Sequence, residues 1–385
     1  MKRKESLLRC SQCKMARYCS TICQKLAWPD HKHECKCLRS IYPKVPTDMT
    51  RLVARIIFKM LTGLPCSSEE LYSMSDLQSN IKGMSEEMKG GLGQLTAMLQ
   101  FYIKEEIPNA SQLPPGLSLL HLFGQVKCNC FTISDGEMQE IGVGLYPSMS
   151  LLNHSCDPNC VIVFDGKQLQ LHAIRQIQAD EEVISYGLTI SYIDVMATSA
   201  ERRRQLETQY CFTCDCERCE TADKDSDMLA GEQRAWKEIK ESIPKVEELQ
   251  SAGNWEEVVD VCQAFIDKNR DVVPDTNLYL LKMLDAATDS CIHLARWEDA
   301  LCYSVRTLRP YQLYYVGSHP VRGVQLMRVG KLQHHQGKLK QAVNTLKQAF
   351  DILTVTHGRE HPLTDNLQQV LAECEAEISC RPQQM

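Results

Sequence analysis

Four cysteines in two separate stretches of the chain have the chemistry and spacing of a zinc site. Cys156 lies in a polar turn sequence, residues 153–160 (NHSCDPNC). Farther along, Cys214, Cys216 and Cys219 follow the pattern Cys-x-Cys-x-x-Cys. Four thiolates make a closed tetrahedral zinc site. The sequence therefore predicts one zinc ion that ties this distant tail to the loop.

A second group of soft ligands lies near the N-terminus, where residues 8–37 are expected to form a small zinc-folded unit. Short spacers let both members of a pair reach one metal ion. The three pairs are Cys10 with Cys13, Cys19 with Cys23, and His31 with Cys35. Because a closed site needs four ligands, six fill one site and half of another. His33 and Cys37 also have ligand spacing and are local alternatives.

Cysteine usage favours an intracellular protein. The 385 residues include 20 cysteines, 11 of them in three clusters, and disulfides are rare in a reducing compartment, where clustered thiols usually bind zinc. The basic N-terminus lacks the apolar core of a signal peptide. No apolar run approaches the roughly 20 residues of a membrane span.

The charge is unevenly distributed. The net charge is −6, yet residues 1–60 hold 14 Lys and Arg against four Asp and Glu. A basic zinc module on an acidic body favours contact with nucleic acid or an acidic partner. Association between the two oppositely charged parts of the chain is the alternative.

The patterning changes along the chain. Residues 47–111 are predicted to be helical, with apolar residues at three- and four-residue steps in 49–60, up to the break at 114–116 (PPG). Residues 117–195 contain short apolar runs between turn formers, which indicates short strands and hairpins. Residues 198–201 (TSAE) match a capping box that opens a charged helix ending near Tyr210.

The region from about residue 228 to the C-terminus shows internal repetition. The segments beginning at Trp255, Trp297 and Leu339 are 42 residues apart, and the two His-Pro pairs at 319–320 and 361–362 keep the same step. A fixed period in helical sequence predicts stacked helix pairs of the tetratricopeptide (TPR) type. Such a stack presents a binding surface or supports a neighbouring domain.

Several motifs together resemble the SET and MYND domain-containing methyltransferases. The cysteine and histidine order of residues 10–35 resembles the MYND finger. The SET resemblance rests on residues 142–147 (GVGLYP), 153–156 (NHSC), 191–194 (SYID) and 210–216 (YCFTCDC). It implies an α+β fold in five parts: a MYND zinc finger (1–38), a helical SET insert (39–116), a SET core (117–195), a zinc-binding post-SET segment (196–224) and a helical TPR-like domain (225–385).

The same resemblance assigns roles to individual residues. Cys10, Cys13, His31 and Cys35 would share one zinc, Cys19 and Cys23 half of a second, and Cys156, Cys214, Cys216 and Cys219 a third. Tyr192 would be the catalytic tyrosine. S-adenosylmethionine would be held by Asn153 and His154, with Tyr72, Asn80, Asn129, Leu152 and Phe212 in support. Phe131 and Tyr210 would line the lysine channel.

The chemistry of methyl transfer explains this choice of residue types. A lysine ammonium, with a pKa of about 10.4, is not a nucleophile. A narrow aromatic channel favours the neutral amine by desolvation, and aromatic faces favour the cationic sulfonium of the cofactor. Taken singly, Asn153 could equally be a turn former, and Tyr192, Phe131 and Tyr210 core aromatics.

The sequence departs from the family pattern in two places. Family members have an upstream segment that supplies a glycine-containing cofactor loop and the remaining ligands of the second finger zinc, so an incomplete cofactor pocket is expected here. Residues 183–188 also form a longer approach to the tyrosine than the family has. Tyr186 therefore competes for the catalytic position, although the order of residues after Tyr192 favours Tyr192.

The expected function is a protein-lysine methyltransferase that acts on histones or other proteins in the nucleus and cytoplasm. The alternative is a catalytically impaired zinc and TPR adaptor, as in a truncated isoform. Expected partners are the protein substrates, proline-rich peptides and chaperone-type proteins, with weak DNA contact through the basic N-terminus. A monomer with no membrane association is expected.

Overall fold

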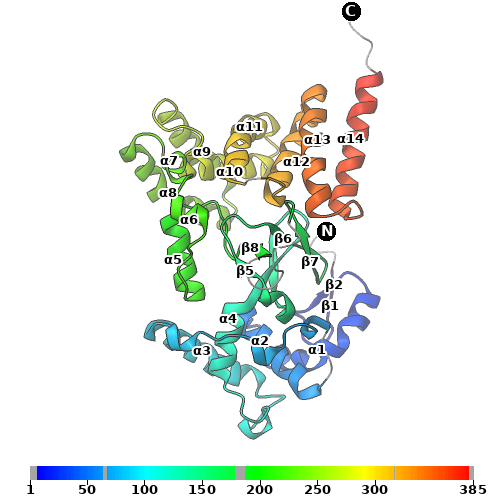
Figure 1. Cartoon of the computed structure of the whole chain (residues 1–385). Helices are drawn as coiled ribbons and strands as arrows, with labels where there is room; N and C mark the ends of the chain where they lie inside the picture. The colour runs from blue at the N-terminus through cyan, green and yellow to red at the C-terminus, as the bar shows by residue number, and fades with distance from the viewer. Residues whose placement is uncertain (1–6, 64–66, 178–186, 316, 381–385) are drawn as a thin grey trace, which may run out of the picture. The chain divides into compact units, whose positions relative to one another are not determined.

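The computed structural model (Figure 1) describes residues 7–63, 67–177, 187–315 and 317–380. The chain divides into two compact units. Unit 1 comprises Met1–Ile133, Ile141–Leu151 and Gln209–Cys211. Unit 2 comprises Ser134–Glu140, Leu152–Thr208 and Phe212–Met385. Helices alternate with short strands before the chain becomes wholly helical, which confirms the predicted α+β class.

Unit 1 begins with a small hairpin and a long helix. Strand β1 (Leu8–Arg9) pairs antiparallel with β2 (Arg17–Tyr18). Helix α1 (Thr21–Ile41) follows, and its N-cap Ser20 accepts a hydrogen bond from the backbone N–H of Cys23. This cap satisfies one of the N–H groups that a helix start leaves without a partner.

Three further helices build the core of unit 1. They are α2 (Asp48–Thr62), α3 (Glu86–Ile103) and α4 (Leu119–Asn129), each with a side-chain cap, from Thr47, Ser85 and Ser118 respectively. Apolar side chains of all four long helices meet in one cluster that includes Leu38, Ile57, Leu99 and Phe123. This burial, rather than helix propensity, supplies most of the stabilisation.

Two predictions about this unit are wrong in part. Residues 119–129, assigned to the strand-rich region, form helix α4, because Leu119, Leu122, Phe123 and Val126 make one buried helical face. Much of the stretch between α2 and α3 is not α-helical. Helix α2 ends at Gly63 in a left-handed conformation. Three short 3-10 turns follow it: η2 (Ser67–Glu69), η3 (Met74–Asp76) and η4 (Ile81–Gly83). At η3 the Ser73 backbone N–H donates to Asp76 Oδ2, a local bond that competes with helix formation.

The rest of unit 1 connects helices and strands. A further 3-10 turn, η5 (Ala110–Gln112), follows α3, and another, η6 (Pro147–Leu151), ends the unit's second segment. Between them β3 (Cys130–Ser134) pairs with β4 (Glu140–Leu145). The turn of this hairpin, Ser134–Glu140, is counted with unit 2.

Unit 2 begins with two small sheets. Strand β5 (Asn153–His154) pairs in parallel with β8 (Thr189–Ile190). Strands β6 (Cys160–Asp165) and β7 (Gln168–Ala173) form an antiparallel hairpin, whose turn includes Gly166 at a φ of 60°. A positive φ suits glycine because it has no Cβ to clash with the backbone. The short strands and hairpins predicted within residues 117–195 thus include this β6–β7 hairpin.

Three short helices follow the strands of unit 2. Helix α5 (Ser199–Tyr210) opens with the predicted capping box, because the Glu201 backbone N–H donates to Thr198 Oγ1 and the Thr198 N–H to Glu201 Oε2. Helices α6 (Glu217–Thr221) and α7 (Asp225–Met228) come next.

The C-terminal half of unit 2 is a stack of long helices, coloured from yellow-green to red in Figure 1. They are α8 (Gln233–Ala252), α9 (Trp255–Lys268), α10 (Leu278–His293), α11 (Trp297–Tyr314), α12 (Pro320–His335), α13 (Leu339–Thr356) and α14 (Pro362–Cys380). The 42-residue period corresponds to the pairs α9–α10, α11–α12 and α13–α14. The predicted repeat of helix pairs is thus confirmed.

The repeat also has a structural signature. Trp255, the first residue of α9, stacks on His293, the last residue of α10, with ring centroids 4.0 Å apart and planes at 4°. Trp297, the first residue of α11, meets His335, the last residue of α12, with ring centroids 5.1 Å apart and planes tilted by 47°. Each Trp thus joins the two ends of one helix pair.

Close helix packing inside the stack depends on a glycine. A Cβ on Gly330 of α12 would lie 2.5 Å from Cδ2 of Leu346 in α13. Such a distance is far below van der Waals contact, so glycine is required for the two helices to approach.

One acidic residue of the stack, Asp285, is half-buried and has a strongly shifted pKa. Asp285 of α10 accepts a hydrogen bond from the Tyr311 hydroxyl at 3.1 Å, while its other oxygen is buried with no hydrogen-bond partner among the described residues. Nearby, Asp289 pairs with Arg328 at 2.7 Å and Asp194 accepts from the Tyr315 hydroxyl at 2.9 Å. Burial and then Asp289 raise the pKa of Asp285 to about 7.

Across the described ranges, none of the helices combines the length and the apolar character needed to cross a membrane.

Candidate active site and metal centres

The loop and the tail cysteines of unit 2 come together. Cys156 follows strand β5, Cys214 and Cys216 lie between α5 and α6, and Cys219 lies in α6. All four sulfur atoms are within 4.8 Å of one another, and Cys156 Sγ is 4.0 Å from Cys214 Sγ and 3.5 Å from Cys219 Sγ. Four thiols at this separation, from a loop and a tail far apart in sequence, fit a closed zinc site.

The acidity of these thiols supports the same interpretation. Hydrogen bonding to Cys216, followed by burial, raises the pKa of Cys156 far above its usual range. The reciprocal hydrogen bond lowers the pKa of Cys216 to about 4. The sulfurs therefore compete for negative charge, because neighbouring thiolates repel one another. A divalent cation among them would remove this conflict.

A second cluster lies in unit 1. The β1–β2 turn contributes Cys10 and Cys13, and one face of α1 contributes His31 and Cys35 at a four-residue step. Cys10 Sγ is 3.7 Å from Cys35 Sγ, and Cys13 Sγ is 3.6 Å from His31 Nε2. The set of three thiols and one imidazole suits structural zinc.

The other ligand candidates of this region lie outside that cluster. Cys19 is exposed and Cys23 half-buried. His33 bonds instead to Glu106, with Nδ1 2.8 Å from Oε2, and Cys37 is fully buried in the helical core. Neither therefore replaces His31 or Cys35.

Four of the predicted site residues meet in unit 2, namely Leu152, His154, Tyr192 and Phe212. The three aromatic rings are neighbours. The ring centroid of His154 lies 5.2 Å from that of Tyr192 and 5.9 Å from that of Phe212. Tyr192 and Phe212 meet edge-on, with ring centroids 6.4 Å apart. The Tyr192 hydroxyl donates to the carbonyl oxygen of buried Leu152. Burial raises the pKa of Tyr192 to about 12, so its hydroxyl keeps its proton at neutral pH.

His154 connects this aromatic group to the cysteine centre. Its Nδ1 accepts a hydrogen bond from the Tyr192 backbone N–H at 3.0 Å. Burial lowers the pKa of His154 to about 4, so the ring is neutral and its only proton is on Nε2. Nε2 lies 3.2 Å from Cys156 Sγ and can donate to it. One imidazole thus contacts both a proposed zinc ligand and the segment after β8 that contains Tyr192.

Asn153 and Asn159 have different roles in the same loop. Asn153 is exposed in strand β5, next to β8. Asn159, which the sequence suggested only as a turn former, accepts from the Thr189 backbone N–H at 2.8 Å and donates to the carbonyl oxygen of Gly187. It therefore fixes the loop against the segment before Tyr192. Tyr186, the competing tyrosine, lies outside the described residues.

The remaining predicted site residues belong to unit 1. Asn80, at a φ of 51°, donates from Nδ2 to the Tyr210 carbonyl oxygen at 3.0 Å. Asn129 donates to the carbonyl oxygens of Gln78 and Gln125, and Tyr72 to that of Asp76. Phe131 meets Tyr146 edge-on at 5.9 Å. Unit 1 thus brings Asn80 and Tyr210 together, while Tyr72 makes a local bond.

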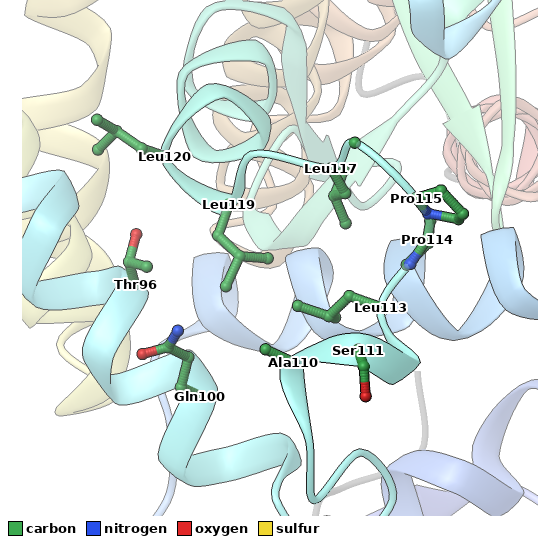
Figure 2. Close-up of a pocket in the computed structure, with 11 residues that line it drawn as sticks. Thr96, Gln100, Ala110, Ser111, Leu113, Pro114, Pro115, Leu117, Leu119 and Leu120 are labelled. Atoms are coloured by element: carbon green, nitrogen blue, oxygen red, sulfur yellow. The ribbon is translucent and has the colours of Figure 1, made fainter.

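Two cavities are separate from these residues. In unit 1, an open pocket of about 560 Å³ is lined by residues of α3, of the segment after it and of the start of α4, including Leu113, Leu117 and Leu119 (Figure 2). In unit 2, one of about 780 Å³ is lined by Trp255, Trp297 and residues of α12. Neither is lined by a predicted cofactor or channel residue.

Sequence reasoning missed two charged residues of the cysteine centre. Arg202 and Arg218 are buried there, although the charged sequence of α5 suggests an exposed helix. The only signal was weak: Ser199, Arg202 and Leu206 share one helical face, and all three are buried.

Known proteins similar to this chain were found over almost its whole length. The MYND finger family matches residues 1–35. Histone-lysine N-methyltransferase SMYD3 of Homo sapiens is 56% identical over 375 residues, which cover 97% of this chain and 86% of that protein. Histone-lysine N-methyltransferase Smyd1 of Mus musculus is 35% identical, covering 98% and 80%, and N-lysine methyltransferase SMYD2 of Gallus gallus is 30% identical, covering 96% and 86%.

Proposed function

This chain belongs to the SET and MYND domain-containing (SMYD) family of lysine methyltransferases, and we propose that it transfers the methyl group of S-adenosylmethionine to lysines of histones or other proteins. The identity to SMYD3 and the MYND finger match confirm the family resemblance seen in the sequence motifs. The observation that carries the proposal is the convergence of the four cysteines in unit 2. It places Phe212 of the tail beside His154 and Tyr192.

The residues present suit a cationic methyl donor. S-adenosylmethionine supplies a methyl group on a positively charged sulfur. The aromatic group of Tyr192 and Phe212 offers ring faces, and the nearby Leu152 carbonyl offers an oxygen, and both of these favour a cation. As the family resemblance implies, cofactor contacts are assigned to Asn153, His154, Leu152 and Phe212, and also to Tyr72, Asn80 and Asn129.

Tyr192 is the proposed catalytic residue. Its protonated hydroxyl is oriented by the Leu152 carbonyl, and its backbone is held by His154. Such positioning matters because methyl transfer is an in-line displacement that depends on the alignment of reacting groups. Phe131 and Tyr210 are assigned to the lysine channel, where an apolar environment favours the neutral amine over the ammonium ion.

The wider assignments follow from the family. The domain order is proposed to be a MYND finger, a helical insert, a SET core, a post-SET segment and a TPR-like stack. Histones in the nucleus and other proteins in the cytoplasm are the proposed substrates. The zinc ions would be held by the two four-ligand clusters, where they would supply structure rather than chemistry.

Calorimetry of this chain with S-adenosylmethionine, followed by labelled-methyl transfer to histones, tests the proposal. Tyr192→Phe should leave cofactor affinity within about threefold while the transfer rate falls by roughly 100-fold or more. Tyr186→Phe is the matched control and should retain activity. Loss of activity in Tyr186→Phe but not in Tyr192→Phe would reassign the catalytic tyrosine. No cofactor binding at millimolar concentration would favour the non-catalytic adaptor.

A further inference from the structure

Two arginines are buried against the four-cysteine centre without an acidic partner. Arg202 of α5 is 1% exposed and Arg218 of α6 is 9% exposed. Both guanidinium groups donate to backbone carbonyl oxygens: Arg202 to those of Ala197 and Arg218, and Arg218 to those of Cys156 and Val195. In the described part of the chain, neither arginine has a carboxylate oxygen within 4.0 Å.

The acidic residues nearby have other cations. Asp157 pairs with Arg175 at 2.6 Å. Asp223 pairs with Lys224 at 3.1 Å, and Glu201 pairs with Lys240 at 3.0 Å. All three of these cations are at least partly exposed. The three carboxylates are therefore paired at the protein surface and not with the buried arginines. The two buried arginines therefore need their negative charge from elsewhere.

A contact between Arg202 and a cysteine sulfur indicates where this negative charge comes from. Arg202 Nη2 lies 3.5 Å from Cys219 Sγ, and the Nε atoms of both arginines are buried with no hydrogen-bond partner among the described residues. Taking an unpaired ion out of water costs several kcal/mol. A carbonyl oxygen lowers this cost but does not neutralise the charge. Thiolates would do so.

We propose that Arg202 and Arg218 are the charge partners of the zinc–tetrathiolate group. A zinc ion held by four thiolates carries two excess negative charges, and the two guanidinium groups supply two positive charges. Arg202 acts directly on the sulfur of Cys219, and Arg218 through the carbonyl group of Cys156. The buried unit of metal, ligands and arginines is then electrically neutral.

This assignment makes the arginines positioning residues for the tail. Arg202 also bonds to Ala197, between Tyr192 and α5, so the same side chain joins that segment to the metal centre. A purely structural arginine would use only the carbonyl contacts. The charge-partner role and a purely structural role make different predictions. If Arg202 is a charge partner, zinc retention should follow the charge at position 202 rather than the overall stability of the fold.

Two measurements on the full chain distinguish the charge-partner role from a purely structural role. A chromophoric chelator reports the rate of zinc release, and native mass spectrometry counts the bound zinc ions. Arg202→Met removes the charge at similar size, Arg202→Gln keeps a donor without charge, and Arg202→Lys keeps the charge. Arg204→Met, at an exposed position of the same helix, is the control. The zinc held by Cys10, Cys13, His31 and Cys35 serves as an internal standard.

We expect the Arg202→Met and Arg202→Gln variants to release one zinc ion roughly 10- to 100-fold faster than wild type. Replacing residues that hydrogen-bond to metal ligands typically weakens metal binding by this factor. Arg202→Lys should remain near the wild-type rate even if its melting temperature is lower, and Arg204→Met should be unchanged. Equal release rates for Arg202→Gln, Arg202→Lys and wild type would overturn the proposal, as would rates that follow melting temperature instead of charge. If Arg202→Met does not fold, the comparison of Gln with Lys decides.

Discussion

Asparagine in place of Asp285 should make the fold more stable at neutral and alkaline pH. The carboxyl group has a pKa of about 7 in the folded protein against 3.8 for an ordinary aspartate. Between these values the unfolded chain has lost the proton that the folded chain still holds. Stability therefore falls as pH rises from about 4 to 7, and is constant above that range with respect to this group.

The size of the effect follows from the difference in pKa. Each unit of difference between the folded and unfolded pKa corresponds to about 1.4 kcal/mol. Above pH 7, Asp285 would therefore lower the free energy of unfolding by up to about 4 kcal/mol. Asparagine keeps the shape and can still accept from the Tyr311 hydroxyl. Asp289, Arg328 and Asp194 also act on Asp285 and remain unchanged in the variant.

Urea unfolding of Asp285→Asn and wild type at pH 5, 6, 7 and 8 is the assay. The variant should gain stability relative to wild type as pH rises, by roughly 2–4 kcal/mol between pH 5 and 8. Asp260→Asn, at an exposed position of α9, should show no such trend. A difference that is independent of pH, or a variant less stable than wild type at pH 8, would refute the reasoning.

Two further substitutions test the packing of the helical stack. Gly330→Ala should destabilise the protein by about 1–3 kcal/mol, because the new methyl group would lie 2.5 Å from Cδ2 of Leu346. Thermal unfolding measures this loss. An unchanged melting temperature would show that α12 and α13 can separate at little cost. Trp255→Ala should destabilise it by roughly 1–3 kcal/mol through loss of the stack on His293, whereas Trp255→Phe should recover about half; equal losses for Ala and Phe would mean that ring stacking contributes little.

Local patterns in the sequence predicted the parts of the fold that depend on spacing. Ligand pairs a few residues apart indicated both metal clusters, because one turn or one helical step brings such residues together. The 42-residue period indicated the helix pairs for the same reason. Residues 119–129 were assigned to strands because a short apolar run fits either a strand or a buried helix, and only packing decides between them.

Long-range burial could not be predicted in this way. Arg202 stands in a sequence of charged residues that suggests an exposed helix face, and nothing in its neighbours shows that the cysteine centre covers it. The hydrogen bond from the Thr189 backbone N–H to Asn159 joins residues 30 positions apart, and no local pattern in the sequence indicates it. The roles of the predicted cofactor and channel residues stay predictions.

The two hydrogen bonds of His154 mean that damage to the thiol group need not remain local. If the cysteines were oxidised and the metal expelled, the imidazole would lose its sulfur partner and with it the restraint on its ring. The peptide N–H of Tyr192 would then exchange with deuterium sooner than the interior of the helical stack. An early exchange signal at this one amide would report oxidative injury before the protein as a whole unfolds.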